Sequence, residues 1–291
     1  MRIGLVGNGY WARVTHAAGL STEPSVSFTG LWGRDPAKSA AVAAEFDVTA
    51  YQSYEQLLDD VDAVAFSVPP QVQSELALIA ARRGKQLLLE KPIAVSVTES
   101  DALVDAVSQA GVASVVFFTA RFDPVHSAWL AGIASQDGWQ GGSGLWLGSA
   151  FGADSPFDTP WRHDKGGLWD VGPHALAMLI GALGPIGELT ARAGQRDLVQ
   201  LMLAHTGGAV SSYAVTIDAP TTVNRNSLTI WGVPGVFEAP ASPPDPPVAL
   251  AAAARELALS YGANPTGQPC DVRLGAEVVR LLAEAERQLA G

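Results

Sequence analysis

The sequence has a single cysteine, few basic residues and no long apolar run, and each shortage excludes a class of protein. Cys270 alone cannot form an internal disulfide, so the chain suits a reducing compartment and we expect a cytoplasmic location. Lysine and arginine number 18 against 29 acidic residues, and the net charge of −11 disfavours nucleic acid as a partner. Apolar runs such as 112–118 and 175–183 are shorter than the roughly 18–20 residues of a membrane span. We therefore expect no association with a membrane.

The beginning of the chain leads directly into a short apolar strand at residues 3–6 and then a glycine. This start is too short and too rich in glycine for the apolar region of a secretory leader, so we expect none. The composition is globular, with 48% hydrophobic and 16% charged residues among 291. A chain of this length indicates about two domains.

A glycine-rich turn follows the first strand. It reads G-N-G-Y-W-A and has the G-x-G-x-x-A spacing of a dinucleotide-binding loop. Gly7 would make the tight turn, Gly9 would let the backbone approach a pyrophosphate, and Ala12 would pack the next helix on the strand. The positive N-terminus of that helix would face the phosphates. We expect the loop, including Tyr10 and Trp11, to bind the cofactor.

The second strand, at residues 26–32, ends without an acidic residue. Enzymes that prefer NAD usually carry an acid there, which binds the ribose 2′-hydroxyl. The position is Gly33 in this chain, with Arg34 beside it and Lys38 one turn into the next helix. A missing carboxylate and two cations favour the 2′-phosphate of NADP, with NAD possible. Alternatively, Arg34 and Lys38 are ordinary surface charges.

Strands and helices alternate as far as about residue 120, and the strands are almost entirely apolar. This pattern predicts a doubly wound parallel sheet, a Rossmann-type domain. Ligands bind such sheets at the carboxyl ends of the strands. One strand ends at Ser67 and Pro69, beside which a nicotinamide could lie. The next strand ends directly before Glu90 and Lys91, which we also expect at the cofactor.

Lys91 is the first catalytic candidate. It follows three consecutive leucines, residues 87–89, which are typical of a strand buried on both faces. Lysine is almost never fully buried without a partner, so an amine at this position suggests a functional site. The alternative is a surface lysine that caps the strand.

The second half of the chain has a different pattern. Consecutive strands without intervening helices predict an α/β domain built on a mainly antiparallel sheet. We therefore divide the chain into a dinucleotide-binding domain at 1–120 and a substrate-binding, oligomerising domain at 121–291. Within the latter, the glycines of 141–144 predict a break before a strand at 145–148, and 151–165 is typical of a loop.

Polar candidates in this half gather between residues 161 and 174. Trp161 and Arg162 suit a hydroxyl-rich or carboxylate-bearing ligand, and packing of Arg162 on Trp161 is an equal alternative. Asp170 and His174 lie four residues apart. Because Pro173 suits only a first helical turn, we expect the helix to begin near Gly172 and leave Asp170 on the preceding turn. By position alone, His174 could equally be a packed or capping residue.

A metal site is not expected. The candidate ligands Asp154, Asp158, His163 and Asp164 lack the spacing that a helix or strand would impose on a metal-binding set.

Together these motifs resemble the glucose-fructose oxidoreductase/inositol dehydrogenase/MocA-type family. The shared elements are the glycine loop with His16 after it, Pro69 at a strand end, E-K-P at 90–92 and G-G-L-W-D-V-G-P-H at 166–174. They cover nearly the whole chain. The resemblance implies hydride transfer between NAD(P) and a sugar, polyol or related small hydroxy or carbonyl compound. It also implies a homo-oligomer, a dimer or tetramer, formed through the second-domain sheet.

Carried over residue by residue, the family's lysine, aspartate and histidine fall on Lys91, Asp170 and His174. The resemblance also makes Lys91–Pro92 a candidate cis peptide bond. We expect His174 to be the general acid or base and Lys91 to donate to the developing alkoxide. Asp170 would orient the histidine or a substrate hydroxyl. The chain departs from the family at Gln73, often histidine, and at Ala177, often an acid.

Two other functions stay open. The chain could be a regulatory protein that senses a cofactor without turning it over. It could also be a hydrolase or lyase that uses tightly bound NAD for a transient oxidation. The presence of lysine, aspartate and histidine together favours the oxidoreductase.

Overall fold

The structure is a computed structural model that describes residues 1–152, 155–261 and 268–290. It divides into two compact units, the first formed by Met1–Asp123 and Asp245–Val279 and the second by Pro124–Pro244 and Arg280–Gly291. The first division lies close to the expected boundary at residue 120. The return of residues 245–279 to the first unit differs from the predicted division, which placed the whole of 121–291 in a second domain.

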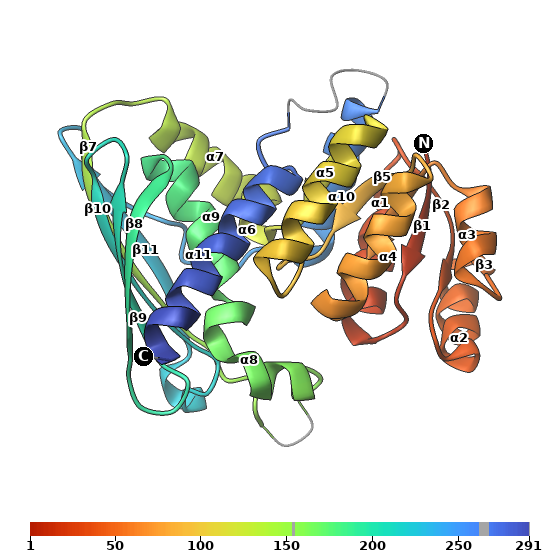
Figure 1. The fold of residues 1–291 in the computed structure, drawn as a ribbon, viewed down its shortest axis with the longest axis horizontal. Coiled ribbons are helices and arrows are strands. Elements are labelled where there is room, and N and C mark those ends of the chain that lie inside the picture. The colour runs from red at the N-terminus through yellow and green to blue at the C-terminus, as the bar shows by residue number, and fades with distance from the viewer. Residues whose placement is uncertain (153–154, 262–267, 291) are drawn as a thin grey trace. The chain divides into compact units, whose positions relative to one another are not determined.

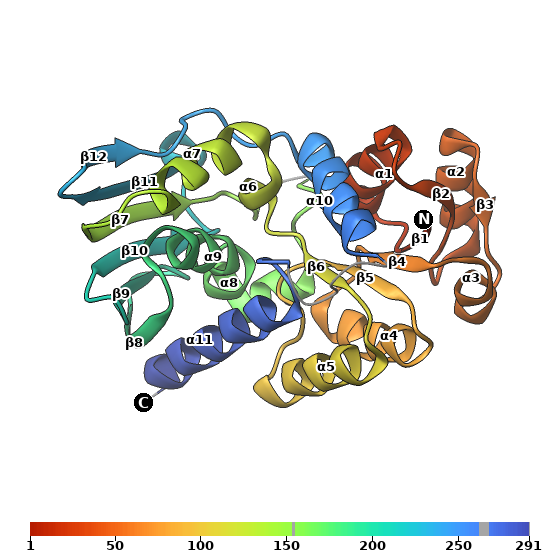
Figure 2. The same cartoon turned by 90° about the horizontal axis from the view of Figure 1, so that it is seen from above.

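A six-stranded sheet forms the core of the first unit (Figure 1), and its strands follow the order β3-β2-β1-β4-β5-β6 (Figure 2). Every pairing in it is parallel, as predicted. The strands β4 and β5 are buried along their whole length because helices cover both faces of the sheet. The strands are β1 (Arg2–Val6), β2 (Ser27–Trp32), β3 (Thr49–Ala50), β4 (Ala63–Phe66), β5 (Gln86–Leu89) and β6 (Ser114–Val116).

Helices α1 and α10 lie on one face of this sheet, and α4 and α5 lie on the other (Figure 2). Polar side chains fix where several of these helices begin. Asp35 caps α2, Ser53 caps α3 and Ser96 caps α5, each by accepting backbone N–H groups. The helices of this unit are η1 (Ala12–Ala17), α1 (Ala18–Thr22), α2 (Pro36–Phe46), α3 (Tyr54–Asp60), α4 (Pro70–Arg82), α5 (Val97–Ala110), α6 (Thr119–Phe122) and α10 (Pro246–Ser260).

Close packing on α1 explains why α10 belongs to the first unit. A Cβ atom on Gly19 would lie 2.7 Å from the carbonyl oxygen of Pro247, so the helices touch where a side chain is missing. Arg255 of α10 also pairs with the buried carboxylate of Glu23 at 2.7 Å. The sequence contained no signal for the surface on which α10 packs.

A second six-stranded sheet forms the other unit, in the order β12-β11-β7-β10-β9-β8. Only the pairing of β7 with β10 is parallel, so the sheet is mainly antiparallel, as predicted. Helices α8 and α9 pack against β10, and α7 packs on α9. The elements are α7 (Pro124–Ala134), β7 (Trp139–Leu147), α8 (Pro160–Asp170), α9 (Gly172–Leu183), β8 (Ile186–Ala193), β9 (Val199–His205), β10 (Val210–Thr216), η2 (Thr221–Val223), β11 (Arg225–Gly232) and β12 (Gly235–Glu238).

Helix α11 (Val272–Ala290) contains the boundary between the two units. Its final turns belong to the second unit, where the Gln288 amide donates to the carbonyl oxygen of Leu189 on β8 at 2.9 Å. Within the described residues, no helix combines the length and the apolar character that crossing a bilayer requires.

Two expectations for the second unit were wrong. Strand β7 begins at Trp139 and runs through the glycines that were expected to interrupt it. These glycines make room for large neighbours, because a Cβ atom on Gly144 would lie 2.4 Å from the Tyr213 ring and one on Gly141 would lie 2.9 Å from the Trp231 ring. Helix α8 begins at Pro160, inside the segment expected to be a loop.

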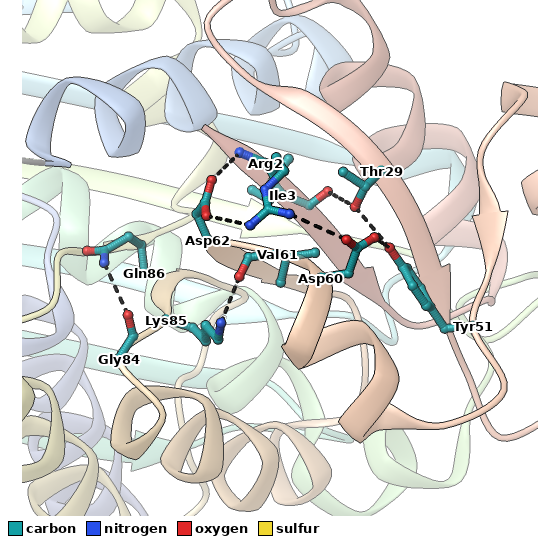
Figure 3. A network of polar contacts seen from close by, with 10 residues as sticks. All are labelled: Arg2, Ile3, Thr29, Tyr51, Asp60, Val61, Asp62, Gly84, Lys85 and Gln86. Atoms are coloured by element: carbon teal, nitrogen blue, oxygen red, sulfur yellow. Dashed lines mark hydrogen bonds and ion pairs between the residues drawn. The ribbon is translucent and has the colours of Figure 1, made fainter.

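A polar network ties together the amino-terminal ends of β1 and β4, opposite the end expected to bind ligand (Figure 3). The backbone N–H of Arg2 donates to Asp62 at 2.8 Å and its guanidinium donates to Asp62 at 3.1 Å. The guanidinium also reaches Asp60, which accepts a short hydrogen bond from Tyr51. Burial by itself would raise the pKa of Asp62, but the hydrogen bonds and charge of Arg2 outweigh it, so the pKa lies below its ordinary value.

We predict that Asp62→Asn lowers the free energy of unfolding by about 0.5–1 kcal/mol at neutral pH, since this pair is partly exposed. A carboxylate with a depressed pKa stabilises the fold above its unfolded pKa of about 3.9, and this contribution is lost as the pH falls. Urea unfolding at several pH values should therefore show a difference between wild type and variant that shrinks on acidification. The control is Asp59→Asn, whose side chain is 77% exposed and pairs with Arg83. Equal losses in both variants would contradict the prediction.

Candidate active site

The glycine loop follows β1. The packing around Gly7 leaves no room for a side chain, whereas Gly9 borders open space. Gly7 has a φ of 129°, and a Cβ atom there would lie 2.3 Å from the carbonyl oxygen of Ser67. Gly7 is therefore required by the loop that follows β4. A Cβ atom on Gly9 would meet nothing within 4 Å, so the backbone faces open space there. This is the arrangement that a loop cradling a pyrophosphate needs.

The helical turn after this loop is η1, a π-helix, where the sequence had indicated an ordinary helix. π-helical turns are rare and occur often at functional sites. Ala12, at its start, is 1% exposed, which fits the expected contact between helix and strand. Tyr10, in contrast, is 50% exposed on the loop. The neighbouring Trp11 turns its indole N–H to the carboxylate of Glu90, at 2.7 Å.

Glu90 is a buried carboxylate at the carboxyl end of β5. Its Oε1 accepts from Trp11 and from Nε2 of His16 at 2.9 Å, and its Oε2 accepts from the backbone N–H of Lys91 at 3.1 Å. Burial by itself would raise the pKa of Glu90. The hydrogen bond and charge of His16, the charge of Lys91 and the indole N–H of Trp11 outweigh that effect, so the pKa lies below its ordinary value. We conclude that Glu90 is ionised at neutral pH.

Gln73 holds the backbone of the same turn. Its Nε2 donates to the carbonyl oxygen of Glu90 at 2.7 Å, and its Oε1 accepts from the N–H of Glu90 at 2.8 Å. Gln73 is fully buried on α4. The sequence had marked this residue only as a departure from the family pattern. The Lys91–Pro92 peptide bond is cis, as the resemblance suggested. Lys91 thus follows a residue that is fixed through both its side chain and its backbone.

The cations expected at the ribose lie just beyond β2. Arg34 is exposed, and Lys38 lies 3.8 Å from the carboxylate of Asp35. The Asp35 carboxylate itself accepts from the backbone N–H groups of Ala37 and Lys38 at the start of α2. Asp35, the first acid after β2 in the sequence, therefore serves as a helix cap. Pro69, the expected nicotinamide neighbour, directly precedes α4.

In the second unit, Asp170 ends α8 and His174 lies in the first turn of α9. The helix begins at Gly172, as predicted, so the two side chains belong to separate helices. Both oxygens of Asp170 accept from the guanidinium of Arg162, at 2.8 and 3.2 Å. Such a bidentate pair fixes the orientation of the carboxylate.

Aromatic rings pack against both Arg162 and His174. The Arg162 guanidinium lies over the rings of Phe157 and Trp161, at 5.4 and 5.6 Å from their centroids. The packing of Arg162 on Trp161 is thus present together with its ion pair. The His174 ring stacks on Trp146 of β7, with centroids 5.4 Å apart and planes inclined by 26°. Trp146 was not among the expected site residues.

Asp197 fixes the turn from which these helices run, and it was not among the expected site residues. Its carboxylate accepts from the backbone N–H groups of Gly167 and Ile217, both at 2.9 Å, and from the Thr216 hydroxyl. Gly166 has a φ of 61°, and a Cβ atom on Gly167 would lie 2.7 Å from the Cα of Thr216. The double glycine therefore lets α8 approach the end of β10. A glycine pair before polar site residues was the only available signal.

Of the residues considered for a metal site, the structure describes Asp158, His163 and Asp164. His163 pairs with Asp158 at 2.6 Å and stacks on Phe151. Asp164 is exposed, and Asp154 lies outside the described residues. Among the residues that the structure describes, no three histidine, cysteine, aspartate or glutamate side chains are placed to hold a metal ion.

Residues 1–118 match the profile of an oxidoreductase family with an NAD-binding Rossmann fold, GFO_IDH_MocA. Over these residues the chain is similar to the Gfo/Idh/MocA family, which agrees with the resemblance found in the motifs of the first half, up to E-K-P at 90–92. The match covers the glycine loop, the Glu90 network and Lys91.

Two relatives show the range of this chain's similarities. D-xylose 1-dehydrogenase (NADP(+)) 2 of Haloferax volcanii is 39% identical over 108 residues, which cover 36% of this chain and 33% of the relative. The scyllo-inositol 2-dehydrogenase (NAD(+)) of Bacillus subtilis is 37% identical over 98 residues, or 32% and 29% of the two chains. The chain thus spans about a third of the length of these relatives.

Likeness of fold extends over the whole chain. The solved structure of levoglucosan dehydrogenase with NADH and L-sorbose superposes with a TM-score of 0.88. The superposition covers 100% of this chain and 96% of that one at 20% identity, and it shows a shared fold.

We predict that Asp197→Asn disturbs the second unit specifically. An amide has one acceptor oxygen where the carboxylate has two, so some of the donors around residue 197 would lose their acceptor. The free energy of unfolding should fall by about 1–3 kcal/mol. Cofactor affinity should be unchanged, whereas the turnover of any responsive substrate should fall. The control, Asp164→Asn, changes an exposed carboxylate of α8, the helix that contains Gly167. A loss of cofactor affinity equal to the loss of turnover would contradict a role confined to this turn.

Proposed function

We propose that this protein is an oxidoreductase that transfers a hydride between NADP and a CH–OH group of a sugar, polyol or similar small hydroxy compound. The observation that carries the proposal is Lys91 at the carboxyl end of β5, directly after a buried, ionised Glu90. In a family of nicotinamide-dependent oxidoreductases, an amine held there suits polarisation of a substrate oxygen. The relatives named as sugar and inositol dehydrogenases support the substrate class.

The residues of the first unit fit a dinucleotide. Gly7 and Gly9, with the N-terminus of the following helical segment, would hold the pyrophosphate, since Gly9 leaves its surroundings open. Ser67, Pro69, Glu90 and Lys91 would lie at the nicotinamide, and Tyr10 would cover the loop. Trp11 would act mainly through Glu90, because its indole N–H is already bound there. The cofactor supplies the hydride chemistry when bound.

We propose NADP as the preferred cofactor, with NAD possible. The end of β2 has no free carboxylate for the ribose hydroxyls, since residue 33 is glycine and Asp35 caps α2. Arg34 is exposed beside this position and would bind a 2′-phosphate, with Lys38 near it. The two relatives differ in the cofactor of their names, so the residues of this chain carry the argument.

In oxidation, His174 would take the hydroxyl proton while Lys91 hydrogen-bonds the developing alkoxide; in reduction, His174 would return the proton. The ion pair with Arg162 holds the Asp170 carboxylate in place before the start of α9. Trp146, stacked on His174, would restrict how the ring turns. Arg162 and Trp161 would contact substrate hydroxyls.

We further propose that the chain forms a homo-oligomer, a dimer or tetramer, through the uncovered face of the second sheet. Side chains alternate between buried and exposed along β9, which indicates one covered and one open face. The open face carries Met202, Val210 and Trp231, which are 50%, 49% and 36% exposed. Apolar side chains gathered on an open sheet face are typical of protein interfaces.

We expect Lys91→Ala and His174→Ala each to lower turnover by more than about tenfold with little change in cofactor affinity. The measurement is the oxidation of NADPH, or reduction of NADP, against a panel of sugars and polyols. Lys85→Ala, at the opposite end of β5, and His163→Ala, on an exposed part of α8, are matched controls. Unchanged turnover in both test variants would refute their roles. Product formed without net cofactor turnover would indicate a hydrolase or lyase, and binding without product would indicate a sensor.

A further inference from the structure

The side chain of Asn8, in the middle of the glycine loop, is fixed against the segment that follows β2. Its Nδ2 donates to the carbonyl oxygen of Asp35 at 2.8 Å and to the hydroxyl of Ser39 at 3.0 Å. Ser39 is 1% exposed on α2, so its hydroxyl is a fixed partner. The loop itself is tied to the end of β2, because the N–H of Gly7 donates to the carbonyl oxygen of Trp32 at 2.9 Å.

This side chain fills the space that a side chain at position 33 would need. A Cβ atom on Gly33 would lie 2.5 Å from Nδ2 and 2.6 Å from Cγ of Asn8. Real Cβ contacts are not this short. The Asn8 amide could move away only by giving up its hydrogen bonds to Asp35 and Ser39. A part-buried donor that loses its partners costs free energy, so the two positions constrain each other.

Position 33 is where the sheet would present the acid that binds an unphosphorylated ribose. We propose that Asn8 is a specificity-determining residue: it occupies the space of that acid, and so leaves Arg34 to select a cofactor with a 2′-phosphate. The inference rests on the proposed NADP-dependent function. It adds that residue 33 cannot be exchanged alone, because Asn8 and Gly33 form a matched pair.

A cycle of cofactor affinities tests the pair. We would measure the dissociation constants of NADH and NADPH for the full-length wild type, Gly33→Asp, Asn8→Gly and the double variant. Gly33→Asp alone should weaken the binding of both cofactors, since the new side chain displaces the glycine loop. The double variant should bind NADH at least about tenfold more tightly than either single variant. Gly33→Asp alone reaching the NADH affinity of the double variant would overturn the proposal.

Thermal unfolding without cofactor supplies an independent reading if Gly33→Asp fails to fold. Gly33→Ala adds only the Cβ atom. It should lower the melting temperature of the wild-type protein, and it should lower that of the Asn8→Gly variant much less. Strictly additive shifts would overturn the packing argument, because residues that do not touch contribute independently. Gly84→Ala is the control for adding a methyl group to a glycine, since its Cβ would meet nothing within 4 Å. Its effect should be the same in both backgrounds.

A different variant, Arg34→Ala, tests the proposed preference for NADP. Arg34→Ala should weaken NADPH binding and leave NADH binding nearly unchanged. Equal losses for both cofactors would contradict the preference for NADP while leaving the coupling of Asn8 to Gly33 intact. Additive effects of the substitutions at positions 8 and 33, together with a selective loss of NADPH binding in Arg34→Ala, would contradict the coupling of Asn8 to Gly33. They would leave the preference for NADP intact.

Discussion

A buried carboxylate needs partners, and those of Glu90 organise the first unit. Isolated in the core, its charge would be costly, yet three groups donate to it: the indole of Trp11, the imidazole of His16 and the N–H of Lys91. These donors come from the helical segment after β1 and from the end of β5. The Gln73 amide adds a connection from α4. The charge of one residue thus fixes the glycine loop relative to Lys91, so that the proposed cofactor loop and the proposed catalytic lysine share one support.

In the second unit, carboxylates again connect segments of the chain around the proposed catalytic group. The carboxylate of Asp197 connects the turn at Gly167 with the end of β10, and the bidentate pair of Arg162 with Asp170 closes the same region. These contacts set the direction of α9 and hence of His174. Each unit therefore holds its proposed catalytic group on rigid elements, with ionised side chains supplying the fixed points.

Periodicity and local chemistry predicted the features that depend on residues close in the sequence. The features that depend on long-range packing were not predicted. Apolar strands alternating with helices predicted the parallel sheet, and Pro173 predicted the start of α9. The glycines of β7 were mistaken for a break, because the rings that occupy their space come from β10 and β11. The roles of Gln73 and Asp197 depend on backbone groups distant in sequence, which no local pattern reveals.

The most direct test of this account is the stability of Glu90→Gln relative to wild type as the pH falls. Glutamine is neutral at every pH, whereas an ionised Glu90 with a depressed pKa stabilises the fold above its unfolded pKa of about 4.3 and loses that contribution on acidification. Denaturant unfolding should therefore show a large gap at neutral pH that narrows steadily in acid. A gap that is absent at neutral pH, or constant throughout, would contradict the claim that a buried ionised carboxylate supports the site.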